Sequence, residues 1–130
     1  MAVSTCLLYN IKEEKIKAIK VLLIRMRVKC NEVKKEDYLK PIGQLAGLKE
    51  FPDQGEYTEA GFEDEMLVMA GFSNAMVNEL LQGLQKMGVG RINLKAVVTP
   101  HNLNWNSLQL RDELAQEHEQ MKKWNADQEK

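Results

Sequence analysis

The sequence has only two cysteines, two histidines and three prolines in 130 residues. Cys6 and Cys30 form no spacing motif and fall in strand-like surroundings, so we interpret both as buried thiols of a cytosolic protein. Zinc requires three or four converging histidine, cysteine or acidic ligands. His101 stands alone, and His118 falls on the apolar stripe of a helix. The sequence therefore predicts no metal site and no disulfide framework.

Long apolar segments are also missing. No run approaches the roughly 20 residues that a membrane span requires. The start of the chain, MAVSTCLLYNIKEEK, lacks the basic region, apolar stretch and cleavage site of a secretory signal. The length, with 44% hydrophobic and 28% charged residues, predicts one ordinary domain over residues 1–124 and a frayed tail over 125–130. We expect a cytoplasmic protein.

The net charge of −1 conceals a polarised chain. Residues 1–49 carry 11 basic and 5 acidic side chains (+6), residues 50–90 carry 1 and 8 (−7), and residues 91–130 carry 6 and 6. The early lysines are interleaved with glutamates on one helix, which is typical of a solvated face, so we expect no nucleic-acid and no membrane partner. Residues 49–64 hold six acids without periodicity. They predict a mobile acidic loop, with a partner-docking patch as the alternative.

Hydrophobic periodicity predicts four strands that alternate with four helices. Two strands are nearly continuous apolar runs (5–9 and 65–72), and two alternate apolar and polar residues (27–33 and 91–99). Amphipathic spacing predicts helices over 11–26 and 74–87, a weaker helix after Pro41 and a long closing helix after Asn106. Asn10 with Glu13, and Ser73 alone, look like helix caps.

This alternation predicts an α/β fold with three layers and a mostly parallel four-stranded sheet flanked by helices. Continuous apolar strands belong in the middle of such a sheet and alternating strands at its edges. The strand order is therefore 2-1-3-4, which is the start of a flavodoxin-like or Rossmann-like, doubly wound topology.

In a sheet of that kind, ligands bind beyond the carboxyl ends of the strands, in a crevice here between the first and third. Three helix N-termini would converge there and present free N–H groups to a small anion or polar metabolite. The residues expected to contact such a ligand are Asn10, Ser73, Thr99, His101, Asn102 and Asn104.

Several chemistries are excluded at this edge. It offers no carboxylate, which argues against a phosphoacceptor site and against a hard cation. No GxxxxGK[ST] or GxGxxG stretch follows the first strand. Ser73 and His101 lack the acid that would orient an imidazole. We expect no catalytic residue and no cofactor.

The stretch TPHNLNWNS (99–107) also has a purely structural interpretation. Asn106 and Gln109 make a capping pair, Pro100 fixes a turn, and Trp105 packs against the core. His101 is the residue that this interpretation explains least.

Three pieces, LLYN (7–10), EMLVMAGFS (65–73) and GRINLKAVVTPHNLNW (90–105), resemble a small bacterial family catalogued as a domain of unknown function, number three-seven-eight-three. The likeness spans most of residues 5–122. The resemblance implies a compact α/β domain and transfers no catalytic residue.

Two functions are favoured, and an enzyme is a third and less expected one. The first is a non-catalytic binding or regulatory domain for a small polar or anionic ligand at the carboxyl edge of the sheet. The alternative is a protein-interaction or homo-oligomerisation module with no small-molecule site, for example a homodimer formed through an exposed strand or helix.

Overall fold

The computed structural model describes residues 4–47, 61–89, 92 and 94–128. Its strands and α-helices alternate as predicted, and one short 3-10 helix is added. The elements are β1 (Thr5–Tyr9), α1 (Glu13–Arg25), β2 (Lys29–Glu32), the 3-10 helix η1 (Lys35–Asp37), α2 (Ile42–Leu45), β3 (Met66–Ala70), α3 (Asn74–Lys86), β4 (Leu94–Val97) and α4 (Ser107–Gln128). The predicted mobile loop over 49–64 falls mostly outside the described residues. Among the described residues, no helix has both the length and the apolarity needed to cross a bilayer.

The four strands form one sheet in the order β2-β1-β3-β4, which confirms the predicted order. β1 pairs with β2 and β3 pairs with β4 in parallel, but the two central strands are antiparallel, with Leu7 opposite Val68. The prediction of a mostly parallel sheet is therefore wrong, and the mixed sheet departs from the flavodoxin arrangement. An apolar composition predicts that a strand is central in the sheet. It does not predict whether the strand is parallel or antiparallel to its neighbour.

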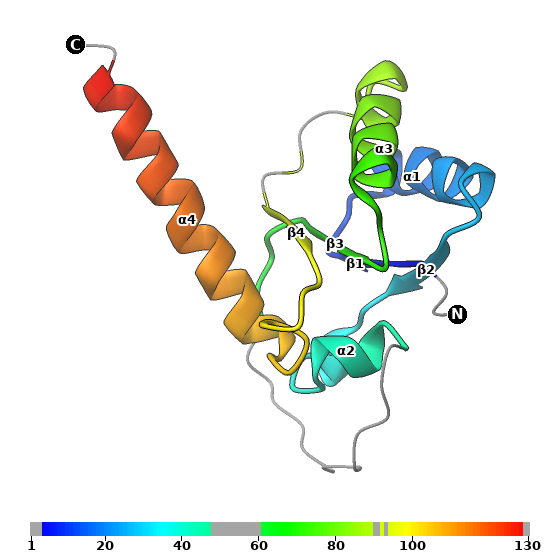
Figure 1. The fold of residues 1–130 in the computed structure, drawn as a ribbon, viewed down its shortest axis with the longest axis horizontal. Coiled ribbons are helices and arrows are strands. Elements are labelled where there is room, and N and C mark those ends of the chain that lie inside the picture. The colour runs from blue at the N-terminus through cyan, green and yellow to red at the C-terminus, as the bar shows by residue number, and fades with distance from the viewer. Residues whose placement is uncertain (1–3, 48–60, 90–91, 93, 129–130) are drawn as a thin grey trace.

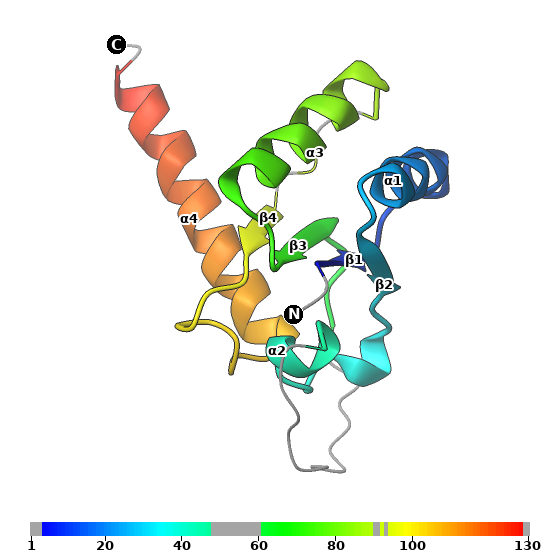
Figure 2. The ribbon, with the colours of Figure 1, turned by 45° about the vertical axis from the view of Figure 1, so that its right-hand side comes forward.

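Helices cover both faces of the sheet, α1 and α3 on one and α2 and α4 on the other (Figure 1, Figure 2). Successive side chains of β1 point to opposite faces of the sheet and so pack with different helices. Cys6 and Leu8 pack with α1 and α3, whereas Leu7 and Tyr9 pack with α2 and the start of α4. Cys6 is buried as predicted, but Cys30 is exposed because β2 is a short edge strand.

The chain contains an internal structural repeat. When Thr5 is aligned with Met66, β1 and α1 match β3 and α3 without a gap, and we call this the first alignment. It also sets Asn10 against Gly71 and Arg27 against Gly88, and all four have left-handed φ angles of 55° to 73°. We call residues 5–46 the first module and residues 66–111 the second module.

After the first helix of each module the alignment changes, because the loop that follows α3 is longer than the loop that follows α1. In this second alignment, β2 (Lys29–Glu32) matches β4 (Leu94–Val97), and the start of α2 at Ile42 matches the start of α4 at Ser107. The two modules are related by a pseudo-twofold axis, since Leu7 pairs directly with its own equivalent, Val68. A second pair of equivalent residues also lies side by side. Pro41 and Asn106, which are equivalent in the second alignment, form an isolated antiparallel β-bridge.

Candidate functional site

Antiparallel pairing of the central strands separates the predicted site residues. Tyr9 pairs with Met66 and Thr5 with Ala70, so the exit of β1 lies beside the entry of β3. Asn10 therefore lies at one edge of the sheet and Ser73 at the opposite edge, about 15 Å away at ~3.4 Å per residue. The crevice expected from a parallel sheet is not formed, and the N-termini of α1 and α3 do not converge.

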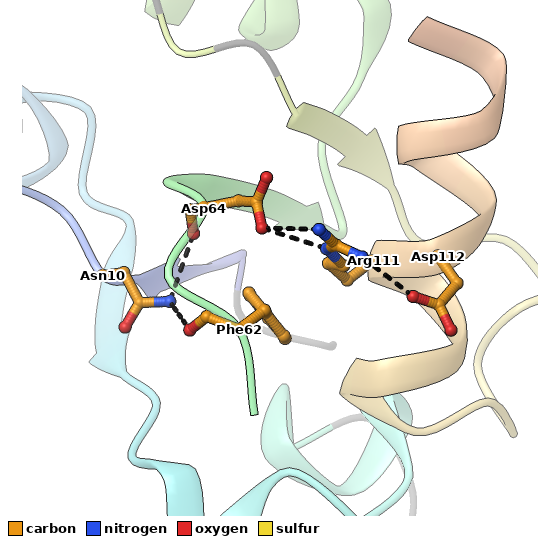
Figure 3. Close-up of polar contacts among 5 residues, drawn as sticks. All are labelled: Asn10, Phe62, Asp64, Arg111 and Asp112. Carbon is orange, nitrogen blue, oxygen red and sulfur yellow. Dashed lines mark hydrogen bonds and ion pairs between the residues drawn. The ribbon is translucent and has the colours of Figure 1, made fainter. Parts of the chain in front are cut away.

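Asn10 holds the segment that leads into β3. Its Nδ2 donates to the carbonyl oxygens of Phe62 at 2.7 Å and Asp64 at 3.1 Å (Figure 3). The left-handed backbone of Asn10, at φ 55°, is one that asparagine tolerates better than most residues. The predicted capping pair with Glu13 is wrong, because the N-cap residue of α1 is Lys12 and it makes no side-chain cap.

Glu65, just before β3, caps α1 from a distance in sequence. Its Oε2 accepts from the Lys12 backbone N–H at 3.1 Å, and its Oε1 accepts from Lys15 Nζ at 2.7 Å. Burial raises the pKa of Glu65, but the hydrogen bonds from Lys15 and Lys12 outweigh it and leave the pKa lowered. A carboxylate at a helix N-terminus is also favoured by the helix dipole.

Glu65→Gln is therefore expected to lower the free energy of unfolding by about 1 kcal/mol at pH 7. The folded-state pKa is lowered, so the stabilisation is present above the ordinary pKa of 4.5 and is lost as the pH falls through the folded value. Urea unfolding from pH 7 to pH 3 should show a smaller loss of stability for the variant than for the parent. Equal pH dependence in the two proteins would contradict this assignment.

Arg111 of α4 ties the same segment to the opposite helical layer. Its Nε and one terminal nitrogen donate to Asp64 Oδ1 at 3.0 and 2.8 Å, and the other terminal nitrogen reaches Asp112 at 3.1 Å (Figure 3). The guanidinium carbon lies 5.9 Å from the centre of the Phe62 ring. Arg111 and Asp64 are 47 positions apart, and no local pattern in the sequence indicates that they meet.

Ser73 caps α3, as the sequence predicts. Its Oγ accepts from the Met76 backbone N–H at 3.2 Å. Because this hydrogen bond satisfies one of the free N–H groups in the first turn, the hydroxyl has a structural role at the position where ligand contact was expected.

Thr99 and Asn102 bond to each other at the exit of β4. The Thr99 N–H donates to Asn102 Oδ1 at 2.8 Å, and the Asn102 N–H donates to Thr99 Oγ1 at 3.3 Å. Asn102 Nδ2 also donates to the Val97 carbonyl at 3.2 Å. Both polar atoms of the Asn102 side chain are thus used to close the turn.

This network predicts different outcomes for two nearby asparagines. Asn102→Ala is expected to lower the free energy of unfolding by about 1–2 kcal/mol, since it removes the side-chain hydrogen bonds that close a partly exposed turn. Asn104 is exposed, so Asn104→Ala should change stability by no more than about 0.5 kcal/mol. Chemical unfolding of both variants measures the difference. Similar effects at the two positions would contradict the assignment.

The rest of TPHNLNWNS leads into α4. His101 is exposed and contacts Trp105 edge-to-face, with ring centres 5.1 Å apart. Asn106 and Gln109 form the predicted reciprocal capping pair, with both hydrogen bonds at 2.9 Å. The stretch is the counterpart of residues 34–42, which lead into α2 in the first module. The structure thus gives His101 one packing contact, with Trp105.

A buried hydroxyl pair lies beneath β1. Tyr9 is fully buried, and its hydroxyl is 2.7 Å from Ser107 Oγ, which is fully buried as well. Burial raises the pKa of the Tyr9 phenol, the hydrogen bond with Ser107 lowers it, and the charge of Tyr38 raises it further. This pair anchors the start of α4 to the centre of the sheet.

The buried polar side chains in the described part of the chain are all hydrogen-bonded. Within the same part of the chain, no group of three or more His, Cys, Asp or Glu residues could hold a metal ion. The predicted site residues divide between two edges of the sheet, and Asn10, Ser73, Thr99 and Asn102 are used in structural hydrogen bonds.

These observations define a small three-layer α/β domain built from two equivalent modules around a mixed sheet. Residues 65–121 match the family model described as Domain of unknown function (DUF3783). This match confirms the resemblance seen in the sequence for the pieces at 65–73 and 90–105, whereas LLYN (7–10) lies outside the matched residues. No curated protein and no solved structure matches the chain.

Proposed function

We propose that the protein is a non-catalytic interaction module, and that its partner binds the part of α4 beyond Arg111, residues 112–128, which we call the α4 extension. The observation that carries this proposal is that α4 continues past Arg111, the position at which the equivalent helix α2 is capped, and that among the described residues of the extension only Leu114 packs against the core cluster. The α4 extension continues for about 25 Å at ~1.5 Å per residue.

The internal repeat defines how much of α4 the fold needs. The equivalent helix α2 ends at Leu45 and is capped by Ala46, and the second alignment places that cap at Arg111. The described part of the first module continues only to Gly47, whose left-handed φ of 71° ends the helix there. Figure 1 and Figure 2 both show the α4 extension standing away from the sheet and from the other helices.

Burial along α4 decreases beyond Leu110, since Leu114, Ala115 and His118 are only partly buried. Leu110 is 2% exposed and belongs to the core, and Leu114 packs partly against it. As far as Gln120, where the described side chains end, the exposed residues of the α4 extension are Asp112, Glu113, Gln116, Glu117, Glu119 and Gln120. Most of these residues are acidic, which favours a partner with a basic surface.

A helix that extends beyond the core needs another source of stability. Most helical stability in proteins comes from the packing of an amphipathic face rather than from helix propensity. Docking into the groove or against the helix of another protein would supply that packing. The two free thiols fit a reducing compartment, so we place this function in the cytoplasm, and the family resemblance suggests a bacterial cell.

Site-specific photocrosslinking tests the proposal. A benzophenone amino acid at Gln116, on the exposed side of α4, should give defined adducts with a partner in the cell that makes the protein. The matched control places it at Gln82, which is an exposed glutamine on α3. Adducts at both positions, or at neither, would show that the α4 extension is not the binding element.

A further inference from the structure

We infer that this chain is a fused pair of copies of one β-α-β-α module, and that β3 with the surface of α3 around Gly83 is a self-recognition surface. It fits a second copy of such a module, and in this chain the first module occupies it. This inference does not depend on the proposed role of the α4 extension.

Equivalent hydrogen bonds recur through both modules. At the ends of α1 and α3, Val28 N donates to Leu23 O at 2.9 Å and Val89 N donates to Leu84 O at 3.1 Å. In the first alignment, Val28 is equivalent to Val89 and Leu23 is equivalent to Leu84, so the two bonds join equivalent residues. Each is the 6→1 bond of a Schellman motif, a common helix ending, so the bonds show that the two helices end in the same way at equivalent residues.

The edge strands repeat the same relation across the two alignments. Val33 N donates to Leu8 O at 2.9 Å, and Val98 N donates to Met69 O at 2.8 Å. The two donors are equivalent in the second alignment, and the two acceptors are equivalent in the first. The modules therefore share strand register as well as helix geometry.

Residues on the pseudo-twofold axis contact their own equivalents. Leu7 pairs with Val68 in the sheet. A Cβ added to Gly83 would lie 2.6 Å from Leu22 Cδ2, so these two helix positions, which are equivalent in the first alignment, meet between α1 and α3. In a dimer with twofold symmetry each axial residue contacts itself in the other copy. The surface around β3 thus has the geometry of such an interface.

The family match supports this division independently. The matched residues 65–121 begin at the start of β3 and end within α4, so they contain one module and exclude the other. A single module has only two strands and leaves the apolar edge of β3 open, which is not a stable arrangement in water. Each of the two cores is built from residues of both modules. A single module therefore needs a second module to cover the edge of its sheet and to complete the two cores.

Cysteine reporters in the full chain test the inference. Cys6 and Cys30, both in the first module, are replaced by Ala and Ser, and a protease site is inserted within residues 48–60. The folded protein is cleaved, and native mass spectrometry must first show that the two pieces remain together. Unfolding and refolding then let the pieces exchange before mild oxidation.

Val68→Cys is expected to link two copies of the second module through a disulfide, because residue 68 would face itself across the axis at about 5 Å between Cα atoms. Met66→Cys is the matched control, since residue 66 would face residue 70 of the other copy and be too far from residue 66. We expect at least tenfold more linked second module at position 68. Equal linkage at both positions, or none at position 68, would overturn the inference.

A second reporter covers the case in which Val68→Cys does not fold. Leu67 would face Met69 of the other copy, so a mixture of Leu67→Cys and Met69→Cys chains should link to each other at least tenfold more than either links to itself. Linkage within each type that equals linkage between them would overturn the inference as well.

Discussion

Gly83→Leu is expected to lower the free energy of unfolding by about 3 kcal/mol, because the new side chain would enter space that Leu22 fills. A Cβ at position 83 would already lie 2.6 and 2.9 Å from the two Leu22 methyl carbons. Leu22→Gly is expected to cost about 4 kcal/mol through the cavity that it leaves and the flexibility of glycine in a helix. Independent effects would therefore sum to about 7 kcal/mol.

The double variant is expected to lie within about 2 kcal/mol of the parent, since the leucine introduced at position 83 would then fill the space that Leu22 vacates. The reason is the pseudo-twofold axis, which makes positions 22 and 83 geometrically equivalent. Urea unfolding of the four proteins gives the coupling energy. Val21→Gln with Gln82→Val is the matched control, because these positions are also equivalent in the first alignment but are both exposed, and their effects should add. Additive effects at positions 22 and 83 would contradict the axis.

Tyr9→Phe is expected to lower the free energy of unfolding by about 1–3 kcal/mol, because it leaves the buried hydroxyl of Ser107 without its partner. Ser107→Ala should cost a similar amount by leaving the Tyr9 hydroxyl unpaired. The double variant should cost much less than the sum, since neither polar group then remains to be buried alone. Chemical unfolding of the three variants measures this coupling, and strictly additive costs would contradict the hydrogen bond.

The same variant has a signature in alkaline solution. Burial raises the folded-state pKa of Tyr9 above its ordinary value of 10.0, so the unfolded chain loses its proton first. The stabilisation is fully present below pH 10 and falls by about 1.4 kcal/mol per pH unit as the pH rises above that value. Tyr9→Phe should remove this contribution from the slope between pH 10 and pH 11.5. An unchanged slope would show that the phenol titrates normally in the folded protein.

The amino-acid pattern predicts the elements better than it predicts their directions. The apolar runs at 5–9 and 65–72 give the central strands and hence the order β2-β1-β3-β4. The caps at Ser73 and Asn106 and the left-handed Gly88 follow from local residue chemistry. The direction of β3 relative to β1 depends on how the chain connects β2 to β3. The residues of the two apolar runs do not predict that connection.

The internal repeat is also hard to detect in the sequence. When residues 5–28 are compared with 66–89, only Leu23, Met26 and Val28 are identical to their equivalents Leu84, Met87 and Val89. Most positions of β1 and β3, and most buried positions of α1 and α3, are apolar in both modules, but nearly all the residues themselves differ. Backbone geometry preserves the repeat because core positions accept many side chains of similar volume.

The sequence by itself determined which segments form strands and helices, which strands lie in the centre, and where the local caps fall, because each depends on residues a few positions apart. Only the tertiary structure decided that β1 and β3 oppose each other. That one choice places Asn10 and Ser73 at different edges and brings Glu65 to the start of α1 and Asp64 to Arg111. These contacts form between residues 53 and 47 positions apart, and their energies exist only once the chain has folded.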